Sequence, residues 1–205
     1  DSGANTVRFM ALSSYPVENY TKILDTSKNM GLDLKFIAVF GNHWQHCEKP
    51  EEAFKKDENW YSSGYKNNYL PHVKETVKAL MTKDNILMLE LMNEPDAQHN
   101  NLKNFADEIS TEIRDMYNEY DKVNKTTIPR HLISLGTDAM TYNTPIYEKE
   151  YSAGLSGNDY KDIYGLPNID VVTAHDYTYD RGLVSGSTSD ISRVFKKHIR
   201  NPPLF

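Results

Sequence analysis

The residues best suited to chemistry stand at the end of a mostly apolar run, residues 86–92, which closes in Asn93-Glu94-Pro95. The run fits a strand that is covered on both faces, as in a parallel sheet. Pro95 has no N–H group to give to a sheet, so the strand stops there and leaves Glu94 at its carboxyl end. A carboxyl group in such a place loses hydration, which raises its pKa and suits a general acid. A plain polar turn is an equal alternative for these three residues.

The side chains of a strand alternate between its two faces. We therefore expect Met88, Glu90, Met92 and Glu94 on one face and Asn93 on the other. If the first set lines a barrel interior, Glu94 stands at the mouth and Glu90 lies deeper.

Polar and aromatic residues also follow other predicted strands, namely Arg8, Asn42-His43-Trp44, His175 and Tyr177. His175 and Tyr177 are two residues apart, so both can point into the same mouth as Glu94. Groups of these kinds hydrogen-bond hydroxyls, stack on a sugar ring and protonate a leaving oxygen, as cleavage of a glycoside requires. His175 could instead be a satisfied core histidine, and Trp44 a loop anchor.

These side chains must be positioned by a scaffold, and the sequence predicts one of alternating strands and helices. Apolar runs predict five strands and the start of a sixth, at residues 6–12, 34–40, 86–92, 131–135, 169–175 and 202–205. Helical spacing predicts the helices between them, near residues 16–31, 71–80, 102–120, 159–164 and 187–198. The alternation indicates an α/β fold, and both a doubly wound sheet and a barrel fit it. No glycine-rich phosphate-binding motif follows any predicted strand, which argues against a nucleotide-binding protein.

Length and composition narrow the class of protein. The 205 residues, 39% hydrophobic and 25% charged, suffice for one substantial globular domain. A net charge of −6 without a basic cluster argues against a nucleic-acid partner. No apolar run approaches the roughly 20 residues that span a bilayer, so we expect no membrane partner. Cys47 is the only cysteine, which excludes an intrachain disulfide, while Asn19 and Asn124 stand in glycosylation sequons.

His43, His46 and Cys47 stand within five residues and could hold zinc. The chain has no second ligand cluster, although an Asp or Glu could complete the site. Sugar binding is the preferred interpretation of His43, and we expect no metal and no other cofactor.

The sequence resembles glycoside hydrolase family 5, the cellulase and mannanase family of the retaining barrel clan. Four motifs in the family's order carry the resemblance across nearly the whole chain. They are Gly3-Ala4-Asn5-Thr6-Val7-Arg8 at the entry into strand two, Asn42-His43-Trp44 after strand three, Glu90-Leu91-Met92-Asn93-Glu94-Pro95 at the end of strand four, and His175-Asp176-Tyr177 after strand six. The resemblance implies a partial (β/α)8 barrel that covers about strand two to the start of strand seven.

The resemblance also implies roles for the residues that match. Glu94 is expected to be the general acid and then the general base, and Asn93 to bond the sugar 2-hydroxyl. Trp44 is expected to stack on a sugar, with His43 as a further substrate-binding residue.

Three more residues are expected to position the second carboxylate and the substrate, namely Arg8, His175 and Tyr177. Arg8 could also neutralise Glu90 inside the barrel, and the two roles are compatible.

The predicted function is endo-acting hydrolysis of a β-glycan with retention of configuration, with β-1,4-mannan as first choice and β-1,4-glucan as second. The choice of mannan rests on the Asn42–Trp44 loop, the Trp60-Tyr61 segment and a long loop after strand five, which are similar to the mannanase branch. The strand-six end, His175-Asp176-Tyr177-Thr178, departs from that branch. The expected partner is a polysaccharide or oligosaccharide substrate, and the expected localisation is secreted. The alternative is a non-catalytic barrel relic that binds glycan or serves as a structural or assembly subunit.

The extent of the chain matters for activity, because an eight-stranded barrel needs about 250 residues. By the resemblance, the chain begins just before strand two and Phe205 falls inside strand seven. We therefore expect residues 1–205 to be a catalytic domain that is incomplete at both ends. A retaining glycosidase has a second carboxylate about 5–5.5 Å from the acid, and in the family it ends strand seven, which falls beyond Phe205. Alone, the fragment is expected to hydrolyse nothing unless the remainder of its barrel is supplied.

Overall fold

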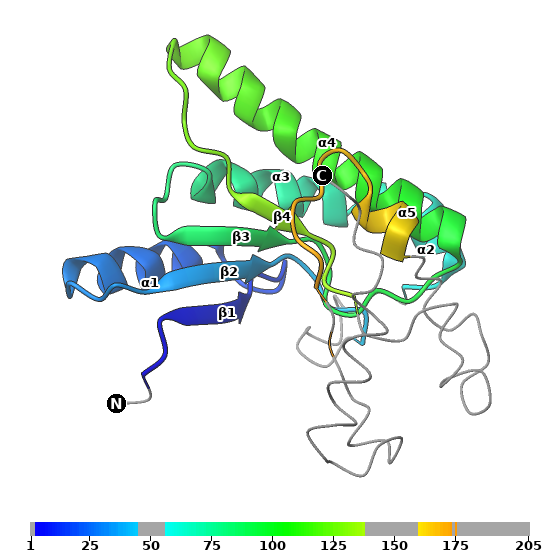
Figure 1. The fold of residues 1–205 in the computed structure, drawn as a ribbon, viewed down its shortest axis with the longest axis horizontal. Helices are drawn as coiled ribbons and strands as arrows, with labels where there is room; N and C mark the ends of the chain where they lie inside the picture. Colours follow the sequence, from blue (N-terminus) through cyan, green and yellow to red (C-terminus); the bar gives the residue numbers. More distant parts are fainter. Residues whose placement is uncertain (1–2, 45–55, 138–159, 174, 176–205) are drawn as a thin grey trace.

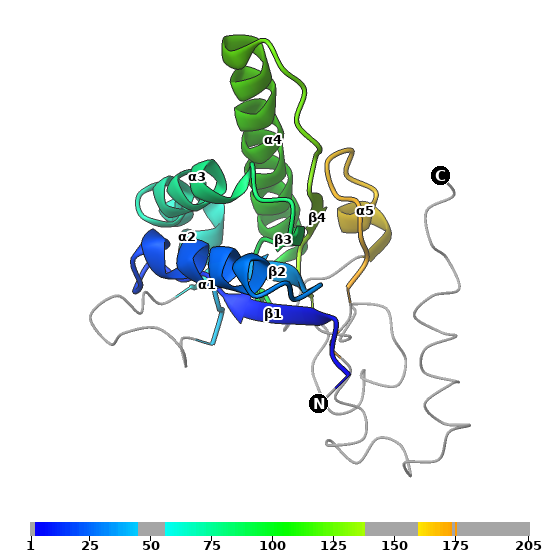
Figure 2. The same ribbon diagram turned by 90° about the vertical axis from the view of Figure 1, so that its left-hand side faces the viewer.

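The computed structural model describes residues 3–44, 56–137, 160–173 and 175. Their centre is a parallel sheet with the strand order β1-β2-β3-β4. The strands are β1 (Thr6–Met10), β2 (Lys35–Val39), β3 (Ile86–Glu90) and β4 (Leu132–Ser134). All four arrows point the same way (Figure 1), and the strands follow a curve rather than a plane (Figure 2). Because helices join consecutive strands, this part of the chain is a partial α/β barrel, as predicted.

Three long helices cover one face of the sheet (Figure 2). They are α1 (Val17–Asn29), α3 (Tyr69–Leu80) and α4 (His99–Asn124), with α1 in contact with α3 and α3 in contact with α4. The apolar stripe predicted for α4 faces inward, since Leu102, Phe105, Ile109 and Ile113 are fully buried. Burial of such a stripe drives a helix onto a sheet even when its own propensity is modest.

The two faces of β1 show what the sheet separates. The ring of Phe9 points to the helices and lies 5.7 Å from Tyr20 and 6.2 Å from Phe36, centroid to centroid. Arg8, the neighbouring residue, points to the opposite face and reaches Glu90 on β3. The face without helices is therefore the one that carries polar groups toward the inside of the curve.

The loop predicted between β2 and α3 contains helical turns that the sequence analysis missed. They are α2 (Glu58–Ser62) and a short 3₁₀ turn, η1 (Gly64–Lys66). The Asp57 side chain caps α2 by accepting the N–H of Trp60 at 3.1 Å. Aromatic contacts hold the turns in place, because Trp60 and Tyr61 both pack against Phe105 of α4.

A strand was predicted at 169–175, but residues 169–173, the continuous part that the structure describes, do not form a regular strand. Asp170 and Val171 both donate their N–H groups to the single carbonyl of Ile133, at 2.9 and 3.2 Å. The Asp170 carboxylate accepts a hydrogen bond from the N–H of Ile133 at 2.7 Å, in place of a backbone carbonyl. A side chain that occupies a ladder position prevents the regular pattern, so residues 169–173 lie beside β4 without forming a ladder with it.

The short helix predicted near residues 159–164 is confirmed as α5 (Tyr160–Tyr164). The predictions for 187–198 and 202–205 lie outside the described residues. No helix in the described ranges is long and apolar enough to cross a membrane.

Candidate active site

The carboxyl ends of the strands bring the predicted polar residues to one edge of the sheet. β3 is the centre of this edge, because its continuation carries Asn93 and Glu94. Asn42, which follows β2, forms an isolated parallel bridge with Asn93. In barrel enzymes, catalytic groups stand at this edge.

The end of β3 departs from the predicted alternation. Leu91 and Met92 both donate their N–H groups toward β4, to Ser134 at 2.8 Å and Leu135 at 3.0 Å. Asn93 then donates toward β2, to the carbonyl of Gly41 at 2.8 Å. Two successive donors on the same side are an irregularity of the bulge type, which shifts the alternation of side chains by one residue.

This shift corrects the expectation that Asn93 lies opposite Glu90. One guanidinium nitrogen of Arg8, Nη2, contacts both residues: it pairs with Glu90 Oε1 and donates to Asn93 Oδ1 at 2.7 Å. Asn93 in turn donates from Nδ2 to Asn42 Oδ1 at 2.8 Å. The amide of Asn93 is thus fixed in orientation by one donor and one acceptor.

Arg8 and Glu90 form an ion pair across the inside of the sheet, as the sequence analysis allowed. The Glu90 side chain is only 2% exposed, whereas the Arg8 side chain is one-third exposed. A buried carboxylate needs such a partner, because an unpaired charge in this position would be costly. The pair therefore stabilises the strand that carries Glu94.

Glu94 lies at the mouth, with its side chain 11% exposed. Its Oε2 accepts from the indole Nε1 of Trp44 at 2.7 Å, and its Oε1 lies 2.9 Å from Nδ1 of His175. Its backbone has a φ of 50°, a left-handed conformation that is uncommon for a residue other than glycine. Residues held in this conformation occur preferentially at functional sites.

His43 stands beside this pair in a hydrophobic setting. Its ring stacks on Tyr61 with an interplanar angle of 17°, and its Nδ1 lies 3.1 Å from the Tyr61 hydroxyl. Burial lowers the pKa of His43 to about 4; the positive charge of Lys56 adds to the effect and the Glu94 carboxylate opposes it. At neutral pH the ring is thus uncharged, with one nitrogen able to donate and one able to accept.

Six of the seven predicted site residues meet at this edge of the sheet, namely Arg8, His43, Trp44, Asn93, Glu94 and His175. The seventh, Tyr177, lies outside the described residues, as do His46 and Cys47 of the zinc alternative. Within the described ranges, no group of three or more His, Cys, Asp or Glu residues is placed to hold a metal ion.

A set of mostly buried hydroxyls near His175 was not predicted from the sequence. Thr137 Oγ1 donates to the carbonyl of Thr173 at 2.8 Å and lies 2.6 Å from the hydroxyl of Tyr164. Ser134 Oγ lies 2.8 Å from Thr173 Oγ1. Ser134 and Thr137 flank the carboxyl end of β4, and that position was the signal that could have found them.

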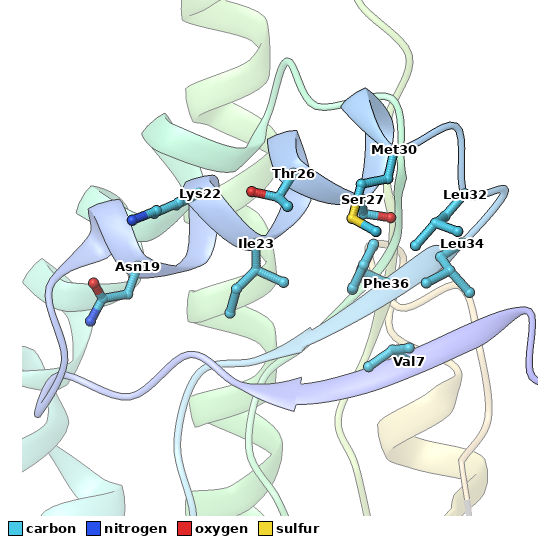
Figure 3. A pocket seen from close by; sticks show the side chains of 10 residues that line it. All are labelled: Val7, Asn19, Lys22, Ile23, Thr26, Ser27, Met30, Leu32, Leu34 and Phe36. Atoms are coloured by element: carbon cyan, nitrogen blue, oxygen red, sulfur yellow. The ribbon is translucent and has the colours of Figure 1, made fainter.

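The described residues also form a hollow away from this edge. It is a groove of about 650 Å³ beside α1, where Val7, Ile23, Met30, Leu34 and Phe36 supply an apolar lining (Figure 3). We call it the α1 groove.

Among the described residues, one buried side-chain polar atom without a hydrogen-bond partner lies in the α1 groove. Ser27 is 6% exposed, and no described residue hydrogen-bonds its hydroxyl. The groove also leaves apolar side chains bare, with Ile23 51% and Met30 67% exposed. Its chemistry is therefore unlike that of the carboxyl edge.

The fold and this edge define a class, the α/β-barrel proteins with an acidic site at the carboxyl ends of their strands. Among solved structures, the chain is similar to the hyperthermostable endo-1,4-β-D-mannanase from Thermotoga petrophila RKU-1. The TM-score is 0.68 at 17% identity, and the match covers 96% of this chain and 69% of the mannanase chain. A second structure of an endo-β-1,4-mannanase from Thermotoga petrophila gives a TM-score of 0.67 at 17% identity, covering 96% of this chain and 52% of the other.

The chain thus spans between about half and about two-thirds of the length of these structures. No protein-family model matches the sequence, and no curated protein matches it. At 17% identity, the likeness establishes the barrel fold.

Proposed function

We propose that this chain is the central part of a retaining endo-β-glycan hydrolase in which Glu94 is the acid and base. The observation that supports this most is the setting of Glu94: a largely buried carboxyl group at the strand edge, held on one oxygen by Trp44 and on the other by His175. A carboxyl group fixed in this way can be presented to a glycosidic oxygen in one orientation, which general acid catalysis requires.

In the proposed reaction, Glu94 gives its proton to the glycosidic oxygen while a second carboxylate attacks the anomeric carbon. The bond to the leaving sugar breaks, and a covalent glycosyl–enzyme intermediate forms. Glu94, now a carboxylate, takes a proton from water, which attacks the anomeric carbon and releases the second carboxylate. Configuration is retained because the anomeric carbon is inverted twice.

The neighbouring side chains have proposed roles in binding. Asn93, whose amide is held by Arg8 and Asn42, bonds the sugar 2-hydroxyl. The neutral ring of His43, whose Nδ1 contacts Tyr61, offers its Nε2 to a sugar hydroxyl. Trp44, which is 44% exposed, offers its indole face to a sugar ring while its N–H holds Glu94.

The nucleophile is proposed to lie beyond Phe205. Glu90 suits the role poorly, because its carboxylate is buried and already engaged by Arg8. Following the family resemblance, we also propose that the nucleophilic carboxylate is positioned by Arg8, His175 and Tyr177.

We propose β-1,4-mannan as the substrate and β-1,4-glucan as the second choice. The structural likeness to two endo-mannanases supports mannan, together with the Asn42–Trp44 loop. Polysaccharides such as mannan and glucan are degraded outside the cell, so we also propose that the protein is secreted.

Residues 1–205 are further proposed to be an incomplete catalytic domain whose partner is the remainder of its own barrel. Two features support this: β1 pairs only with β2 among the described strands, and the α1 groove next to it is bare. A strand edge and an apolar groove side by side are what a further strand and helix would cover.

The test uses the complete gene product and measures reducing sugar released from mannan, glucan and xylan. We expect the highest rate on mannan. Glu94→Ala should lower the rate on the order of 10²–10⁴-fold while glycan binding persists. Glu119→Ala, at an exposed position on α4, is the control and should leave the rate unchanged. An unchanged rate in Glu94→Ala would remove Glu94 from the mechanism, and glycan binding without hydrolysis by the unmodified protein would favour the non-catalytic alternative.

A further inference from the structure

Gly136 and Thr137, which follow β4 after Leu135, contact both members of the Glu94–His175 pair. Glu94 donates its backbone N–H to the carbonyl of Gly136 at 2.8 Å. His175 donates its backbone N–H to the carbonyl of Thr137 at 3.0 Å. Because these acceptors belong to consecutive residues, the position of this short segment determines how Glu94 and His175 face each other.

Thr137 is fixed from its other side by its side chain. Thr137 Oγ1 donates to the Thr173 carbonyl at 2.8 Å, two residues before His175, while the backbone carbonyl of Thr137 receives His175 itself. Thr137 thus holds the approach to His175 at two points. A segment held at two points by one residue has little freedom to slide.

Tyr164 of α5 completes this arrangement. Its hydroxyl lies 2.6 Å from Thr137 Oγ1, 3.0 Å from the Thr173 carbonyl and 3.1 Å from Thr173 Oγ1. Thr137 and Tyr164 are 0% and 3% exposed. Burial raises the pKa of the Tyr164 phenol, so the hydroxyl keeps its proton. Water cannot readily replace a hydrogen bond at this depth, so loss of either hydroxyl removes part of the network that holds Thr173 in place.

We propose that Thr137, held by Tyr164 and Thr173, is a positioning residue that sets the contact between His175 and Glu94. The inference rests on the proposed role of Glu94 as acid and base. His175 Nδ1 is 2.9 Å from Glu94 Oε1, so a displacement of the His175 backbone changes the orientation of the carboxyl group. Misplacement of a catalytic group by about 1 Å can cost on the order of 10²-fold in rate.

The variants that test this are Thr137→Val, which keeps the shape of the side chain and removes its hydroxyl, and Tyr164→Phe. Thr137→Ser, which restores a hydroxyl, is the rescue. Thr76→Val is the matched control, since Thr76 is also fully buried but lies on α3, away from the pair. All are made in the complete gene product.

The first readout does not depend on catalysis. In protein with ¹⁵N-labelled histidine, the ring nitrogen Nδ1 of His175 should give a signal that reports its contact with Glu94 Oε1, assigned by its loss in His175→Asn. We expect the signal to shift or broaden in Thr137→Val and Tyr164→Phe and to stay unchanged in Thr137→Ser and Thr76→Val. An unchanged signal in both Thr137→Val and Tyr164→Phe overturns the positioning role. If Thr137→Val fails to fold, Tyr164→Phe alone decides the result.

The second readout separates positioning from general loss of structure. Aryl glycosides of the cleaved oligosaccharide are compared: a dinitrophenyl leaving group needs no protonation, whereas a poor leaving group does. We expect kcat/KM for the poor leaving group to fall about 10-fold in Thr137→Val, with a change of less than about 3-fold for the dinitrophenyl compound. Equal losses for both compounds would overturn the positioning role. A changed histidine signal in a protein that hydrolyses nothing would instead refute the proposed function and leave the positioning intact.

Discussion

The carboxyl edge of the sheet and the α1 groove lie on the same few strands but treat buried polar atoms in opposite ways. At the edge, Arg8, Glu90, Asn93 and Asn42 satisfy one another across three strands. In the groove, the lining is apolar and the buried hydroxyl of Ser27 has no partner among the described residues.

The polar groups of this network at the edge are satisfied by described residues, whereas the groove has a buried hydroxyl that the described residues leave unsatisfied. A satisfied polar network fixes side chains in one arrangement, which a reaction needs. An apolar groove with one unpartnered hydroxyl differs, because covering it would remove its apolar surface from water. Four sets of variants test this contrast, in decreasing order of the change that we expect in each.

Gly136→Ala should give the largest loss of stability. Gly136 has a φ of 88°, and a Cβ there would lie 2.2 Å from the backbone oxygen of Met92. We expect the free energy of unfolding to fall by more than about 3 kcal/mol in chemical denaturation. Gly31→Ala is the matched control: Gly31 has a φ of 68° but nothing within 4 Å of its Cβ, so the cost should be about 1 kcal/mol. Equal losses for both would show that the edge is no tighter than an open turn.

Arg8→Met should come next, because it leaves the buried Glu90 carboxylate without its partner. We expect a loss of about 2–4 kcal/mol in the free energy of unfolding, less than for a fully buried pair because Arg8 is one-third exposed. Lys28→Met, which removes the exposed ion pair with Asp84, should change little. A small effect of Arg8→Met would mean that the edge is more hydrated than its contacts indicate.

His43 should make stability depend on pH. Its pKa is about 4 in the folded protein against 6.5 for the ordinary side chain, so between these values the unfolded chain binds a proton that the folded one does not. The free energy of unfolding should therefore fall as the pH drops from 6.5 to 4, with no contribution from His43 above this range.

His43→Gln should flatten this dependence, as measured by denaturation at pH 7 and pH 5. A residual slope is expected from His131, whose pKa is also lowered by burial. The same slope in the variant and the unmodified protein would show that His43 is hydrated rather than enclosed by the edge.

Ser27→Ala should have the smallest effect and is the direct test of the groove. Removal of an unpartnered hydroxyl from a helix should leave stability unchanged or raise it by up to about 1 kcal/mol. Thr26→Ala, at an exposed position on the same helix, is the control. A clear loss for Ser27→Ala in the complete gene product would show that a further part of the protein bonds this hydroxyl, and so would break the contrast.

The sequence predicted most of the fold because the residue patterns that indicate strands and helices are local. The apolar runs located all four described strands, with ends that differ from the observed ones by at most two residues. The stripe on α4 and the short α5 were also predicted. The α2 turn was missed, because five residues carry too little periodicity and their helix depends on packing of Trp60 and Tyr61 against Phe105.

In the site, the residues that stand at strand ends were predictable from the sequence, and six of the seven predicted residues meet there. How these residues pair depends on the tertiary structure. The bulge after Leu91 depends on carbonyls of β4, and it turns Asn93 toward Arg8 against the simple alternation. The hydroxyls of Thr137, Tyr164 and Thr173 meet only because three distant segments pack together. A single sequence records residue types along one dimension, whereas hydrogen bonds between distant segments are decided by how the chain closes on itself.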